Sequence, residues 1–184
     1  EKPTRGAVRI GGVPVSRLNE NQLAAFRQKH IGFVFQSYNL LPELTAAENV
    51  AMPLMFKGID PDVRLLEAKK MLCRVGLKDR MDHFPNQMSG GQQQRVAIAR
   101  AFVTHPEVVF ADEPTGNLDT RTTKEVMHMI RGFAHRFHQT IVLVSHDPEM
   151  TEYADRIVTL IDGRIVSNVE NQVKAEIDAA PYIE

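Results

Sequence analysis

The sequence lacks the features of a membrane-spanning, disulfide-linked or strongly charged protein. Its 184 residues include one cysteine, Cys73, so no internal disulfide can form and a reducing compartment is expected. No apolar run approaches the roughly 20 residues that a membrane-spanning helix needs. Neither charge dominates, since 22 Lys and Arg stand against 23 Asp and Glu. The net charge of −1 argues against a protein that coats nucleic-acid backbones, so no nucleic-acid partner is expected.

The composition is that of one globular domain. Hydrophobic residues make up 43% of the chain and charged residues 24%, which is the balance of a folded domain rather than of a disordered tail. A chain of this size buries roughly 70% of its unfolded surface, so its core needs neither a disulfide nor a structural metal.

Short apolar strands alternate with longer amphipathic segments, and this alternation predicts an α/β fold with a mostly parallel sheet. The expected strands are Val8–Ile10, Ile31–Phe35, Val108–Ala111 and Ile141–Val144, followed by a hairpin of Arg156–Ile161 and Arg164–Asn168. Capping residues and apolar faces predict helices over about Asn19–Lys29, Thr45–Phe56, Asp60–Gly76, Gly90–Thr104 and Thr120–His138.

The stretch from Ser37 to Met88 contains no convincing strand. We interpret residues 37–88 as a helical subdomain inserted into an α/β core that consists of residues 1–36 and 89–168. Cys73 lies in the middle of one of these helices and is expected to pack in the interior. Residues 169–184 form a C-terminal tail that is expected to be acidic and helical from about Glu170.

Polar side chains follow three of the predicted strands at the point where each strand ends. Gln36, the pair Asp112 and Glu113, and the pair Ser145 and His146 occupy these positions. Ligands bind outside the carboxyl ends of parallel strands, so these side chains are expected to converge on one phosphate and magnesium site.

Each of these side chains has a chemistry that suits such a site. Asp112 would hold Mg²⁺ directly or through water, because this ion prefers oxygen ligands and keeps several waters. Glu113 would orient or deprotonate an attacking water, and Gln36 would reach the metal or that water. His146 would sense or stabilise charge on a terminal phosphoryl group.

A second anion-binding element is expected at the start of a helix. Ser89 caps this helix, and Gly90, Gly91 and Gln92 follow it. Two glycines allow backbone N–H groups to approach an anion closely at the positive end of the helix dipole.

In this order, these segments resemble the ATP-binding domain of ABC transporters. The matches are Gln36 to the Q-loop, Ser89-Gly90-Gly91-Gln92 to the signature motif, Asp112-Glu113 to the Walker B strand with its following glutamate, Asn117-Leu118-Asp119 to the D-loop and His146 to the switch histidine. Pro114–Asp119 and Ser37–Pro42 further resemble the macrolide-export and lipoprotein-release branch. The resemblance extends from Thr4 to about Asn168.

This resemblance implies a P-loop NTPase fold of the ABC type and an ATPase that uses ATP and Mg²⁺. The family pairs two such domains, as a homodimer or with another cassette. By resemblance, Ser89, Gly90, Gly91 and Gln92 would contact the γ-phosphate of ATP held mainly by the partner domain, and Asp119 would lie at the interface between the two.

The resemblance also implies a membrane partner. A coupling helix of a transmembrane permease subunit would enter a groove beside Gln36 and the helical subdomain. This places the domain at the cytoplasmic face of the inner or plasma membrane. Met52 and Met55 could line such a groove, although filling of the core is an equally good interpretation of these two residues.

The family's P-loop, Gly-x-x-x-x-Gly-Lys-[Ser/Thr], is not found in this sequence, because none of its 11 glycines is followed by lysine. Pro3–Ile10 resembles the segment that follows the P-loop helix in these domains. We therefore expect the P-loop to lie upstream of Glu1. An inactive fragment, which offers a signature motif without a P-loop, is a further interpretation of the sequence.

A soluble ABC-type ATPase that acts on DNA or ribosomes is the alternative. Gln36 and Ser89 are separated by a helical stretch of transporter size, whereas chromosome-maintenance members carry a long coiled coil there. ATPases that act in translation are harder to separate from transporter subunits by sequence.

Overall fold

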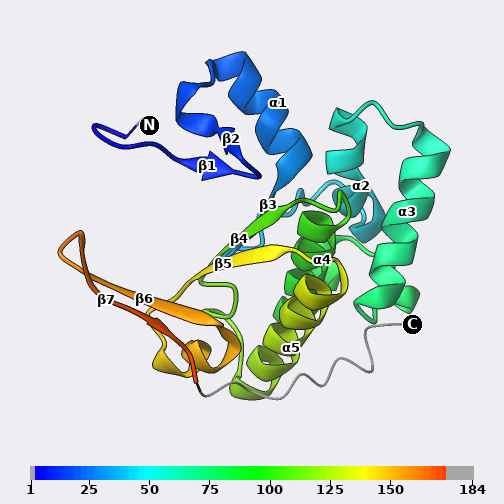
Figure 1. Ribbon diagram of the computed structural model, residues 1–184. Helices are drawn as coiled ribbons and strands as arrows, with labels where there is room; N and C mark the ends of the chain where they lie inside the picture. The colour runs from blue at the N-terminus through cyan, green and yellow to red at the C-terminus, as the bar shows by residue number, and fades with distance from the viewer. Residues whose placement is uncertain (1–2, 173–184) are drawn as a thin grey trace.

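The computed structural model describes residues 3–172 of the chain. Figure 1 shows a small parallel sheet in the middle, with most of the helices gathered on one side of it. An N-terminal segment and a C-terminal hairpin project on the other side. The tail helix is predicted to start at about Glu170, but this residue is the last one of a strand. The rest of the predicted helix, from residue 173 on, lies outside the described residues.

The three central strands are β3 (Ile31–Phe35), β4 (Val108–Asp112) and β5 (Thr140–Val144). They are parallel and lie in the order β3-β4-β5. The other strands form two antiparallel pairs, namely β1 (Arg9–Ile10) with β2 (Val13–Pro14), and β6 (Arg156–Ile161) with β7 (Arg164–Glu170). The predicted α/β fold with a parallel sheet is confirmed.

The helices begin where the sequence predicts caps. They are α1 (Glu20–His30), α2 (Ala46–Phe56), α3 (Pro61–Arg74), α4 (Gly90–Phe102) and α5 (Thr120–Arg136), with short 3₁₀ turns at Val15–Arg17, Lys78–Arg80, Pro85–Gln87 and Pro148–Tyr153. Asn19, Thr45 and Ser89 each accept from the backbone N–H three residues later, in a complete capping box. Gly76, with φ of +74°, follows the end of α3.

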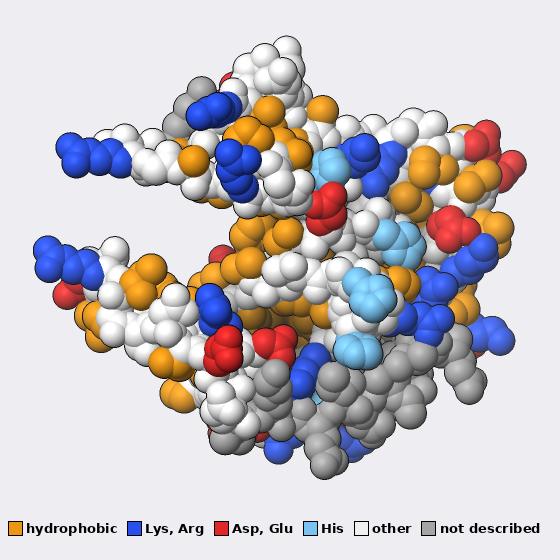
Figure 2. All heavy atoms as spheres, in the orientation of Figure 1, with side chains coloured by type: hydrophobic (Ala, Val, Ile, Leu, Met, Phe, Trp, Pro, Cys, Tyr) orange, Lys and Arg blue, Asp and Glu red, His pale blue; other side chains and the backbone are white. Residues whose placement is uncertain are grey.

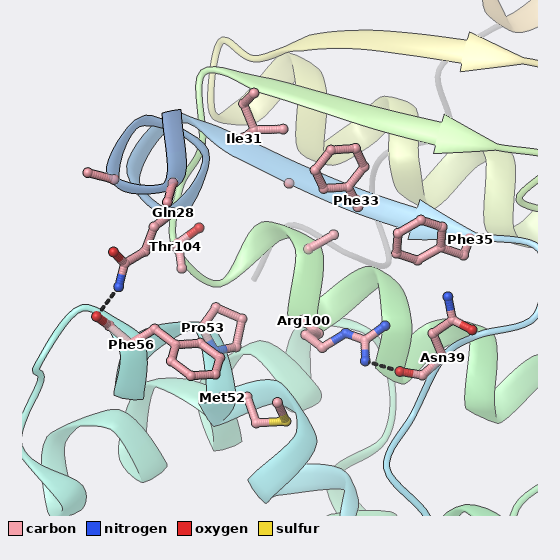
Figure 3. A pocket seen from close by; sticks show the side chains of 14 residues that line it. Gln28, Ile31, Phe33, Phe35, Asn39, Met52, Pro53, Phe56, Arg100 and Thr104 are labelled. Atoms are coloured by element: carbon pink, nitrogen blue, oxygen red, sulfur yellow. Dashed lines mark hydrogen bonds between the residues drawn. The ribbon is translucent and has the colours of Figure 1, made fainter. Parts of the chain in front are cut away.

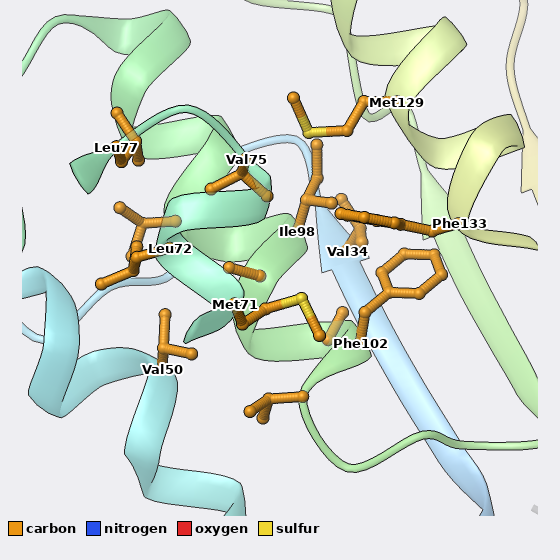
Figure 4. Close-up of a cluster of buried hydrophobic side chains, with 14 of the residues drawn as sticks. Val34, Val50, Met71, Leu72, Val75, Leu77, Ile98, Phe102, Met129 and Phe133 are labelled. Carbon is orange, nitrogen blue, oxygen red and sulfur yellow. The ribbon is translucent and has the colours of Figure 1, made fainter. Parts of the chain in front are cut away.

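One face of the parallel sheet carries the hydrophobic core. Val34, Val109 and Ala111 are fully buried on this face. Phe102 of α4 and Phe133 of α5 pack there with ring centroids 5.2 Å apart. Figure 4 shows side chains of α2 and α3 in the same cluster, so the helices of residues 46–74 share their core with the sheet.

The opposite face of the same sheet is exposed. Phe33 of β3 is 41% exposed, and Val142 and Val144 of β5 are 39% and 53% exposed. Phe33, Phe110 and Val142 are neighbours in the strand register and therefore point to the same side. Figure 2 shows a hollow on this side, between the N-terminal segment and the β6–β7 hairpin, with hydrophobic side chains along its floor.

The prediction that Cys73 packs in the interior is wrong, because its side chain is exposed on α3. The buried positions of this helix are Ala68, Met71 and Leu72, and Val75 follows them into the core. This spacing defines one face of a helix, and residue 73 lies off that face.

Candidate functional site

The carboxyl ends of the three parallel strands meet at one edge of the sheet. Phe35, Asp112 and Val144 are register partners at the last position of their strands. The backbone N–H of Glu113 continues the ladder by donating to the Val144 carbonyl at 2.9 Å. Gln36, Asp112, Glu113, Ser145 and His146 therefore lie along this edge, which is the arrangement that the sequence predicts.

Glu113 is the centre of a compact group of hydrogen bonds. Its Oε1 accepts from the backbone N–H of His146 at 2.8 Å and lies 2.6 Å from His146 Nδ1. Its Oε2 accepts from the Ser145 hydroxyl at 3.0 Å. The side chain of Glu113 is 19% exposed and that of His146 is 86% exposed, so the carboxylate sits behind a solvent-facing imidazole.

The surroundings of Glu113 fix both its backbone conformation and its protonation state. Its φ is +44°, a left-handed conformation that a non-glycine residue adopts only when its surroundings impose it. Burial acts to raise the pKa of Glu113, but the hydrogen bonds from His146 and Ser145 and the charge of His146 outweigh it and lower the pKa. The side chain is therefore a carboxylate at neutral pH.

Asp112 and Gln36 supply exposed oxygen atoms at the same edge. Gln36 is held by the D-loop, since Asn117 Nδ2 donates to its carbonyl at 3.1 Å. A Cβ on Gly116 would lie 2.6 Å from Gln36 Nε2, so this glycine leaves room for the amide. Within residues 3–172 there is no cluster of three acidic, histidine or cysteine side chains suited to a metal. One carboxylate and one amide fit Mg²⁺, which takes few protein ligands and keeps its waters.

The Ser89–Gln92 segment forms the first turn of α4. Ser89 Oγ accepts from Gln92 N at 3.3 Å, and Gln92 Oε1 accepts from Ser89 N at 2.9 Å. A Cβ on Gly90 would lie 2.8 Å from the Tyr38 hydroxyl, and one on Gly91 would lie 2.8 Å from Thr122 Cγ2. The two glycines thus allow the Q-loop and α5 to approach this turn, a packing reason that the sequence did not indicate.

Asp119 caps α5. Its Oδ1 accepts from the backbone N–H groups of Arg121 and Thr122 at 3.1 and 3.0 Å. Its Oδ2 accepts from the Thr122 hydroxyl at 2.7 Å, and this bond is the main cause that lowers the pKa of Asp119. Thr122 is thus bonded to Asp119, and its methyl group fills the space that a side chain on Gly91 would need.

Sequence analysis missed the clamp on the loop that follows Gln36. Tyr38 and Asn39 both have left-handed backbones, with φ of +58° and +50°. Arg100 of α4 donates to the Tyr38 carbonyl at 2.7 Å and to the Asn39 carbonyl. Asn tolerates this conformation, but no pattern in the sequence pairs the loop with an arginine 61 residues away.

A groove runs beside this clamp, between α1, β3, α2 and α4. Its volume is about 620 Å³, and Phe33, Phe35, Met52, Pro53, Phe56 and Arg100 are among its lining residues. Figure 3 shows the phenylalanines of β3 on one side, Met52, Pro53 and Phe56 on the other, and Arg100 between them. The groove adjoins the Q-loop, because Asn39 also lines it.

Comparisons with known proteins agree with this geometry. A family model described as ABC transporter matches residues 1–116. The chain is 46% identical to the macrolide export ATP-binding/permease protein MacB of Salmonella choleraesuis over 98% of its own length, but spans only 28% of MacB. It is 47% identical to the lipoprotein-releasing system ATP-binding protein LolD of Geobacter metallireducens, over 91% of this chain and 75% of LolD.

A solved structure of the dimeric ATP-binding cassette MJ0796, bound to ADP and Pi, has the same fold. The TM-score is 0.82 at 39% identity, and the match covers 92% of this chain and 75% of that one. These are ATP-binding cassettes of transporters rather than ATPases that act on DNA or ribosomes.

The chain belongs to the ABC transporter family. The predicted resemblance to the macrolide-export and lipoprotein-release branch is confirmed, as is the prediction of an ATP-binding unit of a transporter. Among residues 3–172, no helix combines the length and the apolar character needed to cross a bilayer.

Proposed function

We propose that the chain is the nucleotide-hydrolysing part of an ABC transporter subunit that drives a membrane partner through ATP-dependent dimerisation. The observation that carries this proposal is the Glu113 carboxylate, fixed by His146 and Ser145 at the edge where three parallel strands end. Asp112 and Gln36 lie along the same edge.

Glu113 acts on the attacking water. Oε1 is engaged twice by His146, whereas Oε2 accepts one hydrogen bond from Ser145 and keeps a lone pair for a water. The Glu113 carboxylate, whose pKa is lowered, orients that water and accepts its proton. The oxygen of the water bonds to the γ-phosphorus as the bond from that phosphorus to the oxygen of the leaving ADP breaks. His146, exposed beside it, stabilises charge on the terminal phosphoryl group.

Asp112 would hold the magnesium ion, with Gln36 reaching the ion or the water. When bound, Mg²⁺ neutralises charge on the phosphate oxygens. The half-buried turn that begins at the exposed Ser89 and ends at Gln92 faces a second cassette, as does the exposed Asp119. The signature residues of this turn contact the γ-phosphate of ATP held mainly by that partner. The dimeric MJ0796 cassette supports this pairing.

The membrane partner inserts a helix into the groove beside the Q-loop. The apolar walls of the groove suit an amphipathic segment. In this proposal one wall belongs to the helical subdomain of residues 37–88, and the other belongs to the core of residues 1–36 and 89–168. MacB, with its permease part, and LolD, from a lipoprotein-releasing system, support a membrane partner and a peripheral place on the cytoplasmic face of the membrane.

The test is Glu113→Gln in this chain joined to the phosphate-binding segment of LolD. We expect hydrolysis of ATP to fall by roughly 10²–10⁴-fold while ATP binding is kept, because the amide cannot accept the proton. The control is Glu149→Gln, which removes the same charge from an exposed position outside the group around Glu113. An unchanged rate in Glu113→Gln would remove this residue from its assigned role.

A further inference from the structure

The turn that follows Glu113 is held in a conformation that its own residues disfavour. Glu113 has a left-handed backbone, with φ of +44°. It also precedes Pro114, and the ring of a proline pushes the residue before it toward extended conformations. Two steric effects therefore oppose this backbone, and it persists only because the surrounding contacts impose it.

Contacts with the end of β5 and within the turn account for one part of this constraint. The backbone N–H of Glu113 donates to the Val144 carbonyl at 2.9 Å, and the carboxylate is bonded to the loop that follows β5. The Gly116 N–H closes the turn by donating to the Glu113 carbonyl at 3.1 Å. None of these bonds involves the carbonyl of Pro114, which is the next group along the chain.

The side chain of Gln94, from α4, holds that carbonyl. Gln94 is fully buried, and its Nε2 donates to the Pro114 carbonyl. Pro114 is itself buried and has no N–H, so this carbonyl is its only backbone hydrogen-bonding group. A second anchor is Thr115, whose hydroxyl donates to the Met150 thioether at 3.7 Å, but a thioether is a weak acceptor. Gln94 therefore supplies the stronger bond after Glu113.

The other end of the Gln94 amide shows that this bond does more than satisfy a buried group. Its Oε1 is buried and has no hydrogen-bond partner among the described residues. An apolar side chain in its place would leave the Pro114 carbonyl unpaired but would remove Oε1. The number of unpaired buried oxygens would stay the same, so the glutamine gains direction at Pro114 rather than hydrogen-bond satisfaction.

The helix α4 gives Gln94 a fixed base. Figure 4 shows Ile98 and Phe102 of this helix within the hydrophobic core. The first turn of the same helix is the segment from Ser89 to Gln92, which is closed by a capping box. One packed helix therefore holds both this turn and the peptide that follows Glu113.

We propose that Gln94 is a positioning residue for Glu113 and acts through the carbonyl of Pro114. Its hydrogen bond prevents the turn from relaxing to an extended backbone, which would carry the Glu113 carboxylate away from its partners in the loop after β5. The carboxylate thus stays where the attacking water is aligned. The consequence for hydrolysis rests on the function proposed above, whereas the constraint on the turn rests on the contacts alone.

Gln94→Met tests the proposal, because methionine has a similar length and cannot donate. We expect hydrogen exchange of the Glu113, Gly116 and His146 amides, measured by NMR on this chain, to become at least about tenfold faster. In the fusion of this chain to the phosphate-binding segment of LolD, kcat for ATP hydrolysis should fall by about 10–100-fold, with little change in KM. Gln94→Asn keeps an amide but lacks the reach, so it should behave in the same way.

The matched control is Gln139→Met. Gln139 Nε2 also donates to a proline carbonyl, that of Pro106, and its Oε1 is also buried without a partner within residues 3–172. These two residues precede β5 and β4, at the amino edge of the sheet. Both methionine variants should lower the melting temperature to a similar degree, but Gln139→Met should leave kcat and the exchange around Glu113 unchanged.

The outcomes separate this inference from the proposed function. Exchange at Glu113 that is unchanged in Gln94→Met, or equally fast in Gln139→Met, would overturn the positioning role. If Gln94→Met speeds the exchange but the unmodified fusion does not hydrolyse ATP, the proposed function fails and the constraint on the turn stands. If Glu113→Gln abolishes hydrolysis while Gln94→Met keeps the full kcat, the proposed function stands and Gln94 loses its role.

Discussion

The two faces of one small sheet differ in what they pack against. Val34 and Ala111 are completely buried on the face that α4 and α5 cover, whereas Phe33 and Val142, on the same strands or their neighbours, are 41% and 39% exposed. Both faces are apolar in sequence. The difference teaches that the apolar pattern of a strand does not by itself show which of its two faces is packed against helices.

The largest contrast between the faces is expected from removing a phenylalanine from each. Phe102→Ala, in the covered core beside Phe133, should lower the free energy of unfolding by about 3–5 kcal/mol. Phe33→Ala, on the exposed face, should lower it by no more than about 1 kcal/mol, because the side chain already meets water. Urea unfolding measures both values. Equal losses would mean that the exposed face is packed in solution.

A smaller effect is expected where α4 and α5, the helices of the covered side, touch. Gly91→Ala introduces a methyl group 2.8 Å from Thr122 Cγ2, and this overpacking should cost about 1–3 kcal/mol. Thr122→Ser removes that methyl and keeps the hydroxyl that bonds to Asp119. The double variant should therefore regain most of the loss in thermal melting. A double variant as unstable as Gly91→Ala would place the strain in the backbone instead.

The smallest effect concerns the N-terminal cap of α2, the helix whose buried residues belong to the same core as the sheet. Hydrogen bonds from the Thr45 backbone and hydroxyl lower the pKa of Glu48 below its ordinary value of 4.5. A lowered pKa in the folded state gives stability that is complete above about pH 4.5 and is lost as the pH falls through the folded value.

Glu48→Gln keeps an acceptor for the cap but does not titrate. At pH 7 it should be less stable by a few tenths of a kcal/mol, and the difference from the unmodified chain should vanish in more acidic solution. Denaturant midpoints at pH 7 and at about pH 3 measure this. Glu149→Gln is the control, and a difference that persists in acid would exclude the carboxylate as the cause.

Local signals predicted the elements and the edge of the site. Caps at Asn19, Thr45 and Ser89 begin helices as expected, because a side-chain oxygen meets the same backbone N–H that each sequence pattern indicates. The approach of Glu113 to His146 follows from strand order, since the two residues lie one and two positions after the ends of neighbouring parallel strands.

Contacts between distant segments could not be predicted. The Arg100 clamp on Tyr38 and the approach of Thr122 to Gly91 depend on how α4 settles against the Q-loop and α5. The hydrophobic periodicity of one segment does not show which other segment packs against it. The exposure of Val142 was equally hidden, because an apolar strand has the same pattern whether or not something lies over it.

The exposed Cys73 gives this chain a built-in attachment point for a spectroscopic probe. It is the sole thiol in the sequence and lies on α3, while its helix neighbours Met71 and Leu72 are buried in the core. A maleimide dye or nitroxide there labels one site without any substitution. With a second label on β7, the distance between the helical side and the hairpin can be measured. Changes in that distance when nucleotide is added can then be followed in real time.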